Sequence, residues 1–237
     1  MAPPFPAPTK IYRDNTYPTL SPTRPELSAK GKTVIVTGGG SGIGAETARY
    51  FAEAGAARVG IVGRRKQPLL DTKASIEARF PNTEVIAVPT DVTKKSDVDA
   101  AFAKIVGSGK LHVLISGAAV AGPQDAIDVA DADDFLSSID ANIRTALWLA
   151  RAFLRYAVPN AVVVDINSSG AHLRFGDVFG AYSISKGAVF RLWQKVADGR
   201  PELSVFHIQP GVVDTAMNRE AGGIEAVGAE DHGKCNP

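Results

Sequence analysis

The chain has 237 residues, of which 45% are hydrophobic and 22% are charged, and its formal net charge at pH 7 is +1. This length suits one large α/β domain or two small ones, and the near-neutral charge disfavours nucleic acid and anionic membrane surfaces as partners. The single Cys235 excludes an internal disulfide and has no neighbouring metal ligand, and no apolar run reaches membrane-spanning length, so we expect a cytoplasmic protein without a bound metal.

The first thirty residues are rich in proline. Seven of the fifteen prolines lie in residues 1–30, without the basic-then-apolar pattern of a signal peptide. Proline interrupts both helices and sheet pairing, so we expect an extended arm here. Its apolar residues Ile11, Tyr12, Tyr17 and Leu20 could lie against the surface of the domain that residues 31–237 form.

A glycine-rich segment opens this domain. The apolar run over residues 32–36 predicts a buried strand, residues 37–44 read Thr-Gly-Gly-Gly-Ser-Gly-Ile-Gly, and residues 45–51 continue with helical spacing. The N–H groups at a helix N-terminus attract a diphosphate, and glycine allows the backbone to approach it closely. A glycine-rich loop without a ligand is the alternative, but the flanking strand and helix favour phosphate binding.

Strands and helices alternate through the rest of the domain. Further strands are predicted at residues 57–62, 84–88, 111–117, 161–166 and 204–209. Helices are predicted at residues 68–81, at 95–106 with Ser96 as the candidate cap, at 133–156 and at 182–197. Because the strands are continuous apolar runs, they indicate a parallel sheet covered on both faces. We therefore predict a single Rossmann-type, doubly wound α/β domain, whose ligands bind at the carboxyl ends of the strands.

Arg64 and Arg65 follow the second predicted strand. The usual dinucleotide site has an acidic residue here that binds the adenosine ribose 2′-OH. Guanidinium groups pair with a 2′-phosphate instead, which favours NADP over NAD. A solvated basic turn is the alternative.

Tyr182 and Lys186 lie four residues apart at the start of a predicted helix, on one helical face. A nearby ammonium favours the phenolate and is expected to lower the pKa of Tyr182, which makes the phenol a general acid or base. Ser169, thirteen residues before Tyr182, can hydrogen-bond a substrate oxygen, and Ser168 is the competing choice. Asn142 can present its amide to the site or serve as a buried structural residue.

Together these motifs resemble the classical short-chain dehydrogenase/reductase family over about residues 31–215. The glycine loop is similar to the family's cofactor loop, and Tyr182-x-x-x-Lys186 is similar to its active-site motif. The resemblance implies that Tyr182 transfers the proton and that Ser169 orients and polarises the substrate oxygen. It also implies that Lys186 holds the nicotinamide ribose and lowers the pKa of the tyrosine, while Asn142 supports a water in the proton relay.

The resemblance also implies a set of cofactor contacts. Asp91 is similar to the residue that contacts adenine, and the segment from Pro210 to Thr215 is similar to the one that holds the nicotinamide carboxamide. The expected NADP(H)-binding residues are Gly38, Ser41, Gly42, Ile43, Gly44, Arg64, Arg65, Asp91, Val92, Gly117, Tyr182, Lys186, Pro210, Gly211 and Thr215. Family members commonly form homodimers or homotetramers through the helices equivalent to residues 133–156 and 182–197.

Two segments depart from the family pattern. The usual Asn-Asn-Ala-Gly is Ser-Gly-Ala-Ala at residues 116–119, which removes amide side chains that normally brace the strand and predicts weaker cofactor affinity. After Thr215 the family continues with helices and a last strand, whereas residues 216–237 have little apolar periodicity. We expect a shortened C-terminus without the usual last helix and strand, an exposed sheet edge and a partly open pocket.

The leading hypothesis is an NADP(H)-dependent oxidoreductase that interconverts a carbonyl and a secondary alcohol of a small molecule, with Tyr182 as general acid/base. The alternative is a catalytically impaired or non-catalytic nucleotide-binding or scaffold protein. A redox-neutral enzyme on the same scaffold has no positive sign in the sequence. Phe175, Val178 and Phe179 either line an apolar substrate pocket or pack within their loop.

Overall fold

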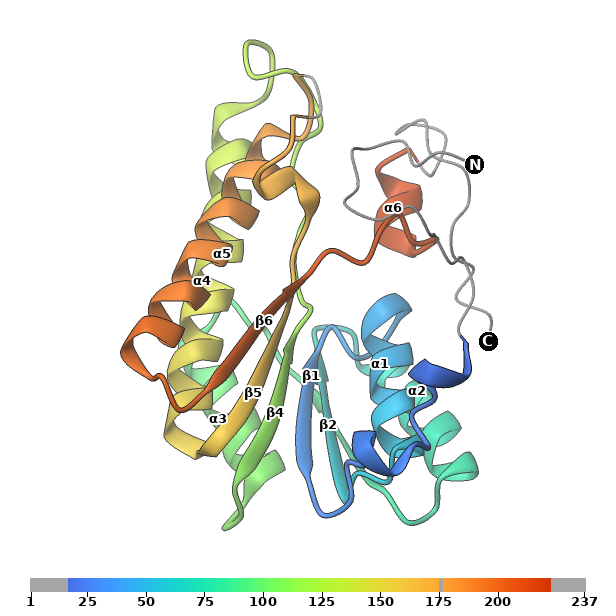
Figure 1. Ribbon diagram of the computed structural model, residues 1–237. Coiled ribbons are helices and arrows are strands. Elements are labelled where there is room, and N and C mark those ends of the chain that lie inside the picture. The colour runs from blue at the N-terminus through green and yellow to red at the C-terminus, as the bar shows by residue number, and fades with distance from the viewer. Residues whose placement is uncertain (1–16, 175–176, 223–237) are drawn as a thin grey trace.

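The computed structural model describes residues 17–174 and 177–222. Figure 1 shows one twisted sheet with helices on both sides. Two residues of the proline-rich segment, Ile11 and Tyr12, lie outside the described residues, as do Phe175 and most of the C-terminal tail at residues 223–237. The described residues form one α/β domain.

The sheet has six parallel strands in the order β3-β2-β1-β4-β5-β6. The strands are β1 (Thr33–Thr37), β2 (Arg58–Gly63), β3 (Glu84–Pro89), β4 (Leu111–Ser116), β5 (Ala157–Ile166) and β6 (Ser204–Ile208). The chain winds outward from β1 to β3, then returns to the other side of β1 and winds outward again from β4 to β6. The strand order therefore reverses between β1 and β4, which confirms the predicted doubly wound topology.

Helices cover both faces of the sheet (Figure 1). One face carries α1 (Gly42–Glu53) and α2 (Lys66–Arg79), and the other carries α3 (Lys95–Val106), α4 (Ala132–Tyr156) and α5 (Gly180–Gly199). Strand β1 lies between the two layers: Val34 and Val36 pack toward α1 and α2, Ile35 packs toward α3, α4 and α5, and all three have 0% exposure. This double burial explains why the strand is apolar at every central position.

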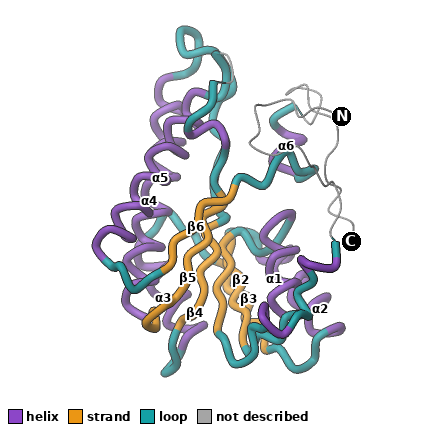
Figure 2. The backbone as a smooth tube through the Cα atoms, in the orientation of Figure 1, coloured by secondary structure: helices purple, strands orange, loops and turns teal. Residues whose placement is uncertain are grey.

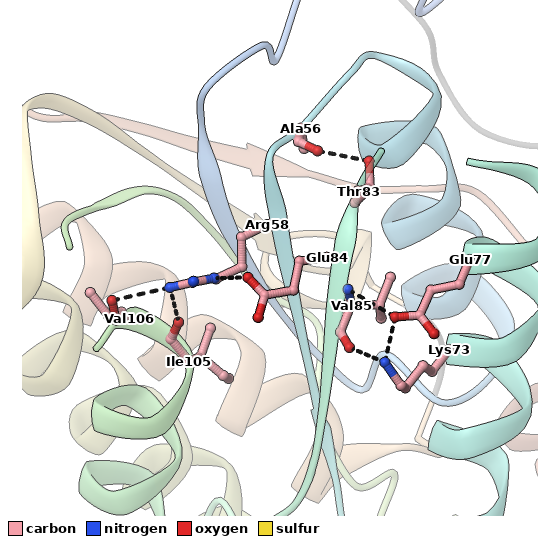
Figure 3. A network of polar contacts seen from close by, with 9 residues as sticks. All are labelled: Ala56, Arg58, Lys73, Glu77, Thr83, Glu84, Val85, Ile105 and Val106. Atoms are coloured by element: carbon pink, nitrogen blue, oxygen red, sulfur yellow. Dashed lines mark hydrogen bonds and ion pairs between the residues drawn. The ribbon is translucent and has the colours of Figure 1, made fainter. Parts of the chain in front are cut away.

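Polar contacts attach α2 and α3 to the sheet at the ends where β2 and β3 begin (Figure 3). Arg58 Nη1 donates to the main-chain oxygens of Ile105 at 3.0 Å and Val106 at 3.3 Å, and Arg58 Nε donates to Glu84 at 2.8 Å. The last carbonyls of a helix have no partner within the helix and attract a cation, so Arg58 stabilises the C-terminus of α3. These contacts lie away from the carboxyl ends of the strands, where the candidate site forms.

The structure corrects two predicted helix starts. Helix α3 has Lys94 as its N-cap, and Ser96 lies in the first turn, where its hydroxyl donates to Asp97 at 3.1 Å. Helix α2 begins two residues before Pro68. Proline is tolerated there because the first N–H groups of a helix have no intrahelical acceptor.

The two described termini contain short helices that periodicity did not predict. Residues 17–30 hold the 3₁₀ turns η1 (Pro18–Leu20) and η2 (Pro25–Leu27), and Lys30 pairs with Ala56 in an isolated bridge. After β6, a loop leads to the five-residue helix α6 (Ala216–Glu220), which lies beyond the sheet on the side of α1 (Figure 2). Thr215 caps the N-terminus of α6, and its hydroxyl accepts from the N–H of Asn218 at 3.2 Å.

Candidate active site

The glycine loop brings the start of α1 close to the end of β1. A Cβ on Gly44 would lie 2.3 Å from the carbonyl oxygen of Gly38, so only glycine permits this approach. Gly38 itself has a φ of +75°, and Gly42, the first residue of α1, has a φ of +52°. The side chain of Ser41 makes no capping hydrogen bond. The first turn of α1 therefore presents bare backbone at the carboxyl edge of the sheet, a geometry that suits a diphosphate.

Thr37 joins β1 to β4 beside this loop. Its Oγ1 accepts from the N–H groups of Gly117 at 3.0 Å and Ala118 at 3.2 Å, and donates to the carbonyl of Ile115 at 3.2 Å. A Cβ on Gly117 would lie 2.8 Å from the carbonyl oxygen of Thr37. The threonine hydroxyl thus braces the end of β4, where Ser116 and Gly117 carry no amide side chain, and the two backbones pack too closely for a larger residue at position 117.

A cavity of about 260 Å³ lies over the carboxyl ends of the central strands. It is lined by the glycine loop, by the segments that follow β4, β5 and β6, and by the first turns of α5 and α6. Many of the predicted site residues meet in its wall. They are Ile43, Gly44, Gly117, Ser169, Tyr182, Lys186, Pro210, Gly211 and Thr215.

The predicted adenosine-side residues lie outside the cavity wall. Arg64 and Arg65 are exposed directly after β2, and within the described ranges neither side chain forms a hydrogen bond or an ion pair. Asp91 accepts two hydrogen bonds from Thr93, at 3.1 Å from the main-chain N–H and at 2.7 Å from the hydroxyl, and these contacts lower the pKa of its carboxyl. Val92 is 8% exposed and packs in the core.

Tyr182 and Lys186 share the cavity, but their protonation equilibria differ from the sequence prediction. Burial raises the pKa of the Tyr182 phenol, although a hydrogen bond with Ser168 acts in the opposite direction, and burial lowers the pKa of Lys186. The Lys186 Nζ donates to the carbonyl of Ile166 at 2.6 Å and lies 5.6 Å from the centroid of the tyrosine ring. The predicted lowering of the tyrosine pKa was therefore wrong for this structure: desolvation dominates, and the amine is directed to a backbone oxygen.

Both candidate serines line the cavity at the end of β5. Ser168 forms a side-chain hydrogen bond with Tyr182 and accepts from the N–H of Gly170 at 3.1 Å, as the cap of the 3₁₀ turn η3 (Ser169–Ala171). Ser169 is buried, and its hydroxyl accepts from Gln209 Nε2 at 3.4 Å. The structure thus places one hydroxyl on the phenol and the other deeper in the cavity wall.

Asn142 belongs to the structural frame of the site. Its Nδ2 donates to the carbonyl of Val120 and to Ser185 Oγ, both at 2.9 Å, and its Oδ1 accepts from the N–H of Val120 at 2.9 Å. The amide therefore fixes the segment after β4 against α4 and α5. Asn142 also lines a separate cavity of about 10 Å³ beside Lys186, which is close to the volume needed for one water.

Several cavity residues were not predicted. Asn218 on α6 lines the cavity, and its Nδ2 is buried and has no hydrogen-bond partner in the described structure. Gln209 and Met217 also line the wall. Phe179 lines it too, in a left-handed conformation with a φ of +61°, whereas Val178, named with it from the sequence, is 39% exposed. The Thr-x-x-Asn cap at Thr215 was the one sequence signal that could have located α6 and Asn218.

Comparisons with known proteins agree on one family. The model of the short chain dehydrogenase family matches residues 32–224. A short chain dehydrogenase/reductase of Claviceps purpurea (strain 20.1) is 30% identical over 215 residues, which cover 89% of this chain and 72% of the relative. The short chain dehydrogenase/reductase AacuD of Aspergillus aculeatus is 30% identical over 230 residues, which cover 96% of this chain and 79% of the relative.

Solved structures give the same result. A short-chain type dehydrogenase/reductase from Mycobacterium ulcerans superimposes with a TM-score of 0.75 at 29% identity, covering 81% of this chain and 71% of that one. A short chain dehydrogenase from Burkholderia cenocepacia J2315, solved in complex with NADP, has a TM-score of 0.73 at 27% identity and covers 80% of this chain and 78% of that one.

Proposed function

The chain belongs to the short chain dehydrogenase family, and on that premise we propose that it is an NADP(H)-dependent oxidoreductase that interconverts a carbonyl group and a secondary alcohol. The observation that carries the proposal is the shared cavity: the glycine loop, Tyr182, Lys186 and two serine hydroxyls line the same 260 Å³ space. This arrangement supports the transfer of a hydride to the carbonyl carbon and of a proton to the oxygen bonded to that carbon.

The proton chemistry follows from the groups that surround the phenol. Burial favours the protonated form of Tyr182, which suits donation of its proton to a substrate oxygen during carbonyl reduction. The hydroxyl of Ser169 lines the same cavity, which supports its assignment to orienting and polarising that oxygen, and Ser168 is hydrogen-bonded to the phenol itself. When bound, the nicotinamide cofactor supplies the hydride to the carbonyl carbon.

The cofactor site fits a dinucleotide at two places. Ile43 and Gly44 line the cavity, and the side chain of Ser41 makes no capping hydrogen bond, so the first turn of α1 offers its backbone N–H groups to a diphosphate. Arg64 and Arg65 supply two exposed guanidinium groups after β2, which suit a 2′-phosphate. The relative from Burkholderia cenocepacia was solved with NADP, which supports the same preference here. The remaining contacts, including those of Asp91 and Thr215, are proposed as the family resemblance implies.

We also propose an oligomeric state and a cellular location. Three large apolar side chains are exposed on α4 and α5. Ile184 on α5 is 49% exposed, and Leu136 and Leu147 on α4 are 63% and 38% exposed. These side chains support a homodimer or homotetramer through the two helices. Helices in the described ranges are too short or too polar to cross a membrane. We propose a cytoplasmic location on the separate ground of the single cysteine.

A substrate panel tests this function against the non-catalytic alternative. NADPH absorbance is followed with a series of ketones and aldehydes, and cofactor binding is measured in parallel by fluorescence. We expect NADPH to bind and at least one carbonyl compound to be reduced. NADPH binding without turnover of any compound would favour the nucleotide-binding protein instead. Absence of both binding and turnover would contradict both hypotheses.

A further inference from the structure

A buried carboxylate lies behind the proposed catalytic pair. Asp165, on β5, is 1% exposed, and its Oδ2 accepts from Asn167 Nδ2 at 2.6 Å and from His207 Nδ1 at 3.1 Å. A carboxylate only accepts hydrogen bonds, so the imidazole donates here. His207 lies opposite Asp165 in the register of β5 and β6, and its ring is 4.3 Å from that of Phe190.

This group is connected to the active site through Asn167. The Nδ2 of Asn167 also donates to the main-chain carbonyl of Lys186 at 3.3 Å, and its Oδ1 accepts from the N–H of Ser168 at 2.8 Å. One polar network therefore runs from His207 through Asp165 to the backbone of the catalytic lysine and of the serine that contacts Tyr182. Such a network fixes positions as well as charges.

Asp165 and Lys186 also line the same small cavity of about 10 Å³. The other polar residues in its wall, Ser116, Asn142 and Thr145, carry no charge. The titratable groups that interact with Asp165 are thus Lys186 and Tyr182 from α5 and His207 from β6. The negative charge raises the pKa of Lys186 and of Tyr182 alike.

We propose that Asp165 is a positioning residue that acts as the internal counter-charge of the Tyr182–Lys186 pair, with His207 as the partner that holds and modulates this charge. The proposal rests on the proposed function, because it concerns proton transfer at the same site. Burial of an ammonium without an anion favours its neutral form. The Asp165 carboxylate offsets that cost for Lys186 and keeps Tyr182 in its protonated, proton-donating form.

Loss of the Asp165 charge is expected to shift the apparent pKa of the Tyr182–Lys186 pair in a defined direction. Because an anion raises the pKa of every neighbouring group, its removal lowers the apparent pKa of the coupled pair. We compare the pH dependence of kcat/KM for NADP-dependent alcohol oxidation in Asp165→Asn and in the surface control Asp198→Asn. We expect the apparent pKa to fall by about one unit in Asp165→Asn and to stay unchanged in the control. A folded Asp165→Asn protein with an unchanged profile would overturn the proposal.

Two variants of His207 separate charge from structure and serve if Asp165→Asn fails to fold. His207→Arg places a permanent cation beside Asp165, so we expect the apparent pKa to fall in the same direction. His207→Gln retains a neutral donor, so we expect little change. A shift in His207→Gln as large as that in His207→Arg would show a structural effect and overturn the proposal.

A measurement that does not need turnover distinguishes this proposal from the proposed function. The phenol of Tyr182 is titrated by tyrosinate absorbance, as the difference between each protein and the same protein carrying Tyr182→Phe. We expect the titration midpoint to fall by about one unit in Asp165→Asn, even if no substrate is turned over. Equal midpoints in Asp165→Asn and the parent protein would refute the role of Asp165 while leaving the oxidoreductase proposal intact.

Discussion

The hydroxyl of Thr37 accepts a hydrogen bond from the N–H of Gly117 at 3.0 Å. It thereby joins β1 to the end of β4, the two strands between which the strand order of the sheet reverses. Thr37 is fully buried, so its removal leaves the N–H groups of Gly117 and Ala118 without a partner. We expect Thr37→Val to lower the free energy of unfolding by about 1–3 kcal/mol. Chemical denaturation measures this change.

The same strand offers a control for this prediction. Thr33, at the other end of β1, is partly exposed, and we expect Thr33→Val to change the free energy of unfolding by less than about 0.5 kcal/mol. Thr37→Ser retains the hydroxyl and should recover most of the loss. Equal stability of Thr37→Val and Thr33→Val would show that the hydroxyl does not brace β4.

The contact of Gly44 with Gly38 predicts a steric effect on both folding and cofactor binding. An added Cβ at Gly44 meets backbone, which cannot move aside as a flexible side chain can. We expect Gly44→Ala to destabilise the domain by at least about 1–3 kcal/mol and to weaken NADPH binding. Gly199→Ala is the control, since a Cβ there meets nothing within 4 Å. Thermal unfolding and NADPH titration measure the two effects. Equal results for the two variants would contradict the close approach of Gly44 to Gly38.

Arg64 and Arg65 predict the cofactor preference. If their guanidinium groups bind a 2′-phosphate, the double Ala variant loses charge-assisted hydrogen bonds that NADH never makes. We expect Kd for NADPH to rise by about tenfold to a hundredfold, with little change for NADH. The control is Arg79→Ala at the C-terminal end of α2. Parallel losses for both cofactors would refute the assignment of these arginines to the 2′-phosphate.

The two serines predict separable effects on catalysis. If Ser169 polarises the substrate oxygen, Ser169→Ala lowers kcat more than Ser168→Ala does, by roughly tenfold or more. Ser168→Ala should instead change the pH profile, because it removes a hydrogen bond that lowers the pKa of Tyr182. The apparent pKa is then expected to rise. Steady-state kinetics across pH measure both effects. A larger kcat loss in Ser168→Ala than in Ser169→Ala would show that the two serines have the opposite roles.

The fold could be predicted from the sequence because the pattern of apolar residues was unambiguous. Val34, Ile35 and Val36 are apolar in succession, as expected for a strand whose two faces are both covered by helices. A strand with one face in solvent would instead alternate apolar and polar residues. The order of strands and helices and the place of the site at the carboxyl ends of the strands followed from the apolar pattern. Helix α6 did not, because five residues are too few to show a helical period.

The electrostatics of the site depended on contacts that spacing does not determine. A separation of four residues placed Lys186 and Tyr182 on one face of α5, but it could not show that the lysine amine binds the carbonyl of Ile166. Nor could it show how deeply the phenol is buried. The contact of Asp165 with His207 required the register of β5 and β6, which strand propensities leave open.

We propose that Tyr182 transfers a proton during turnover of an NADPH-dependent reaction. The decisive measurement is of kcat and of the Kd for NADPH in Tyr182→Phe, with a carbonyl substrate found in the panel. We expect a loss of about 10²–10⁴ in kcat with cofactor affinity changed less than about threefold, since the hydroxyl is lost but the ring remains. A Tyr182→Phe protein that binds NADPH and turns over at the parent rate would contradict it.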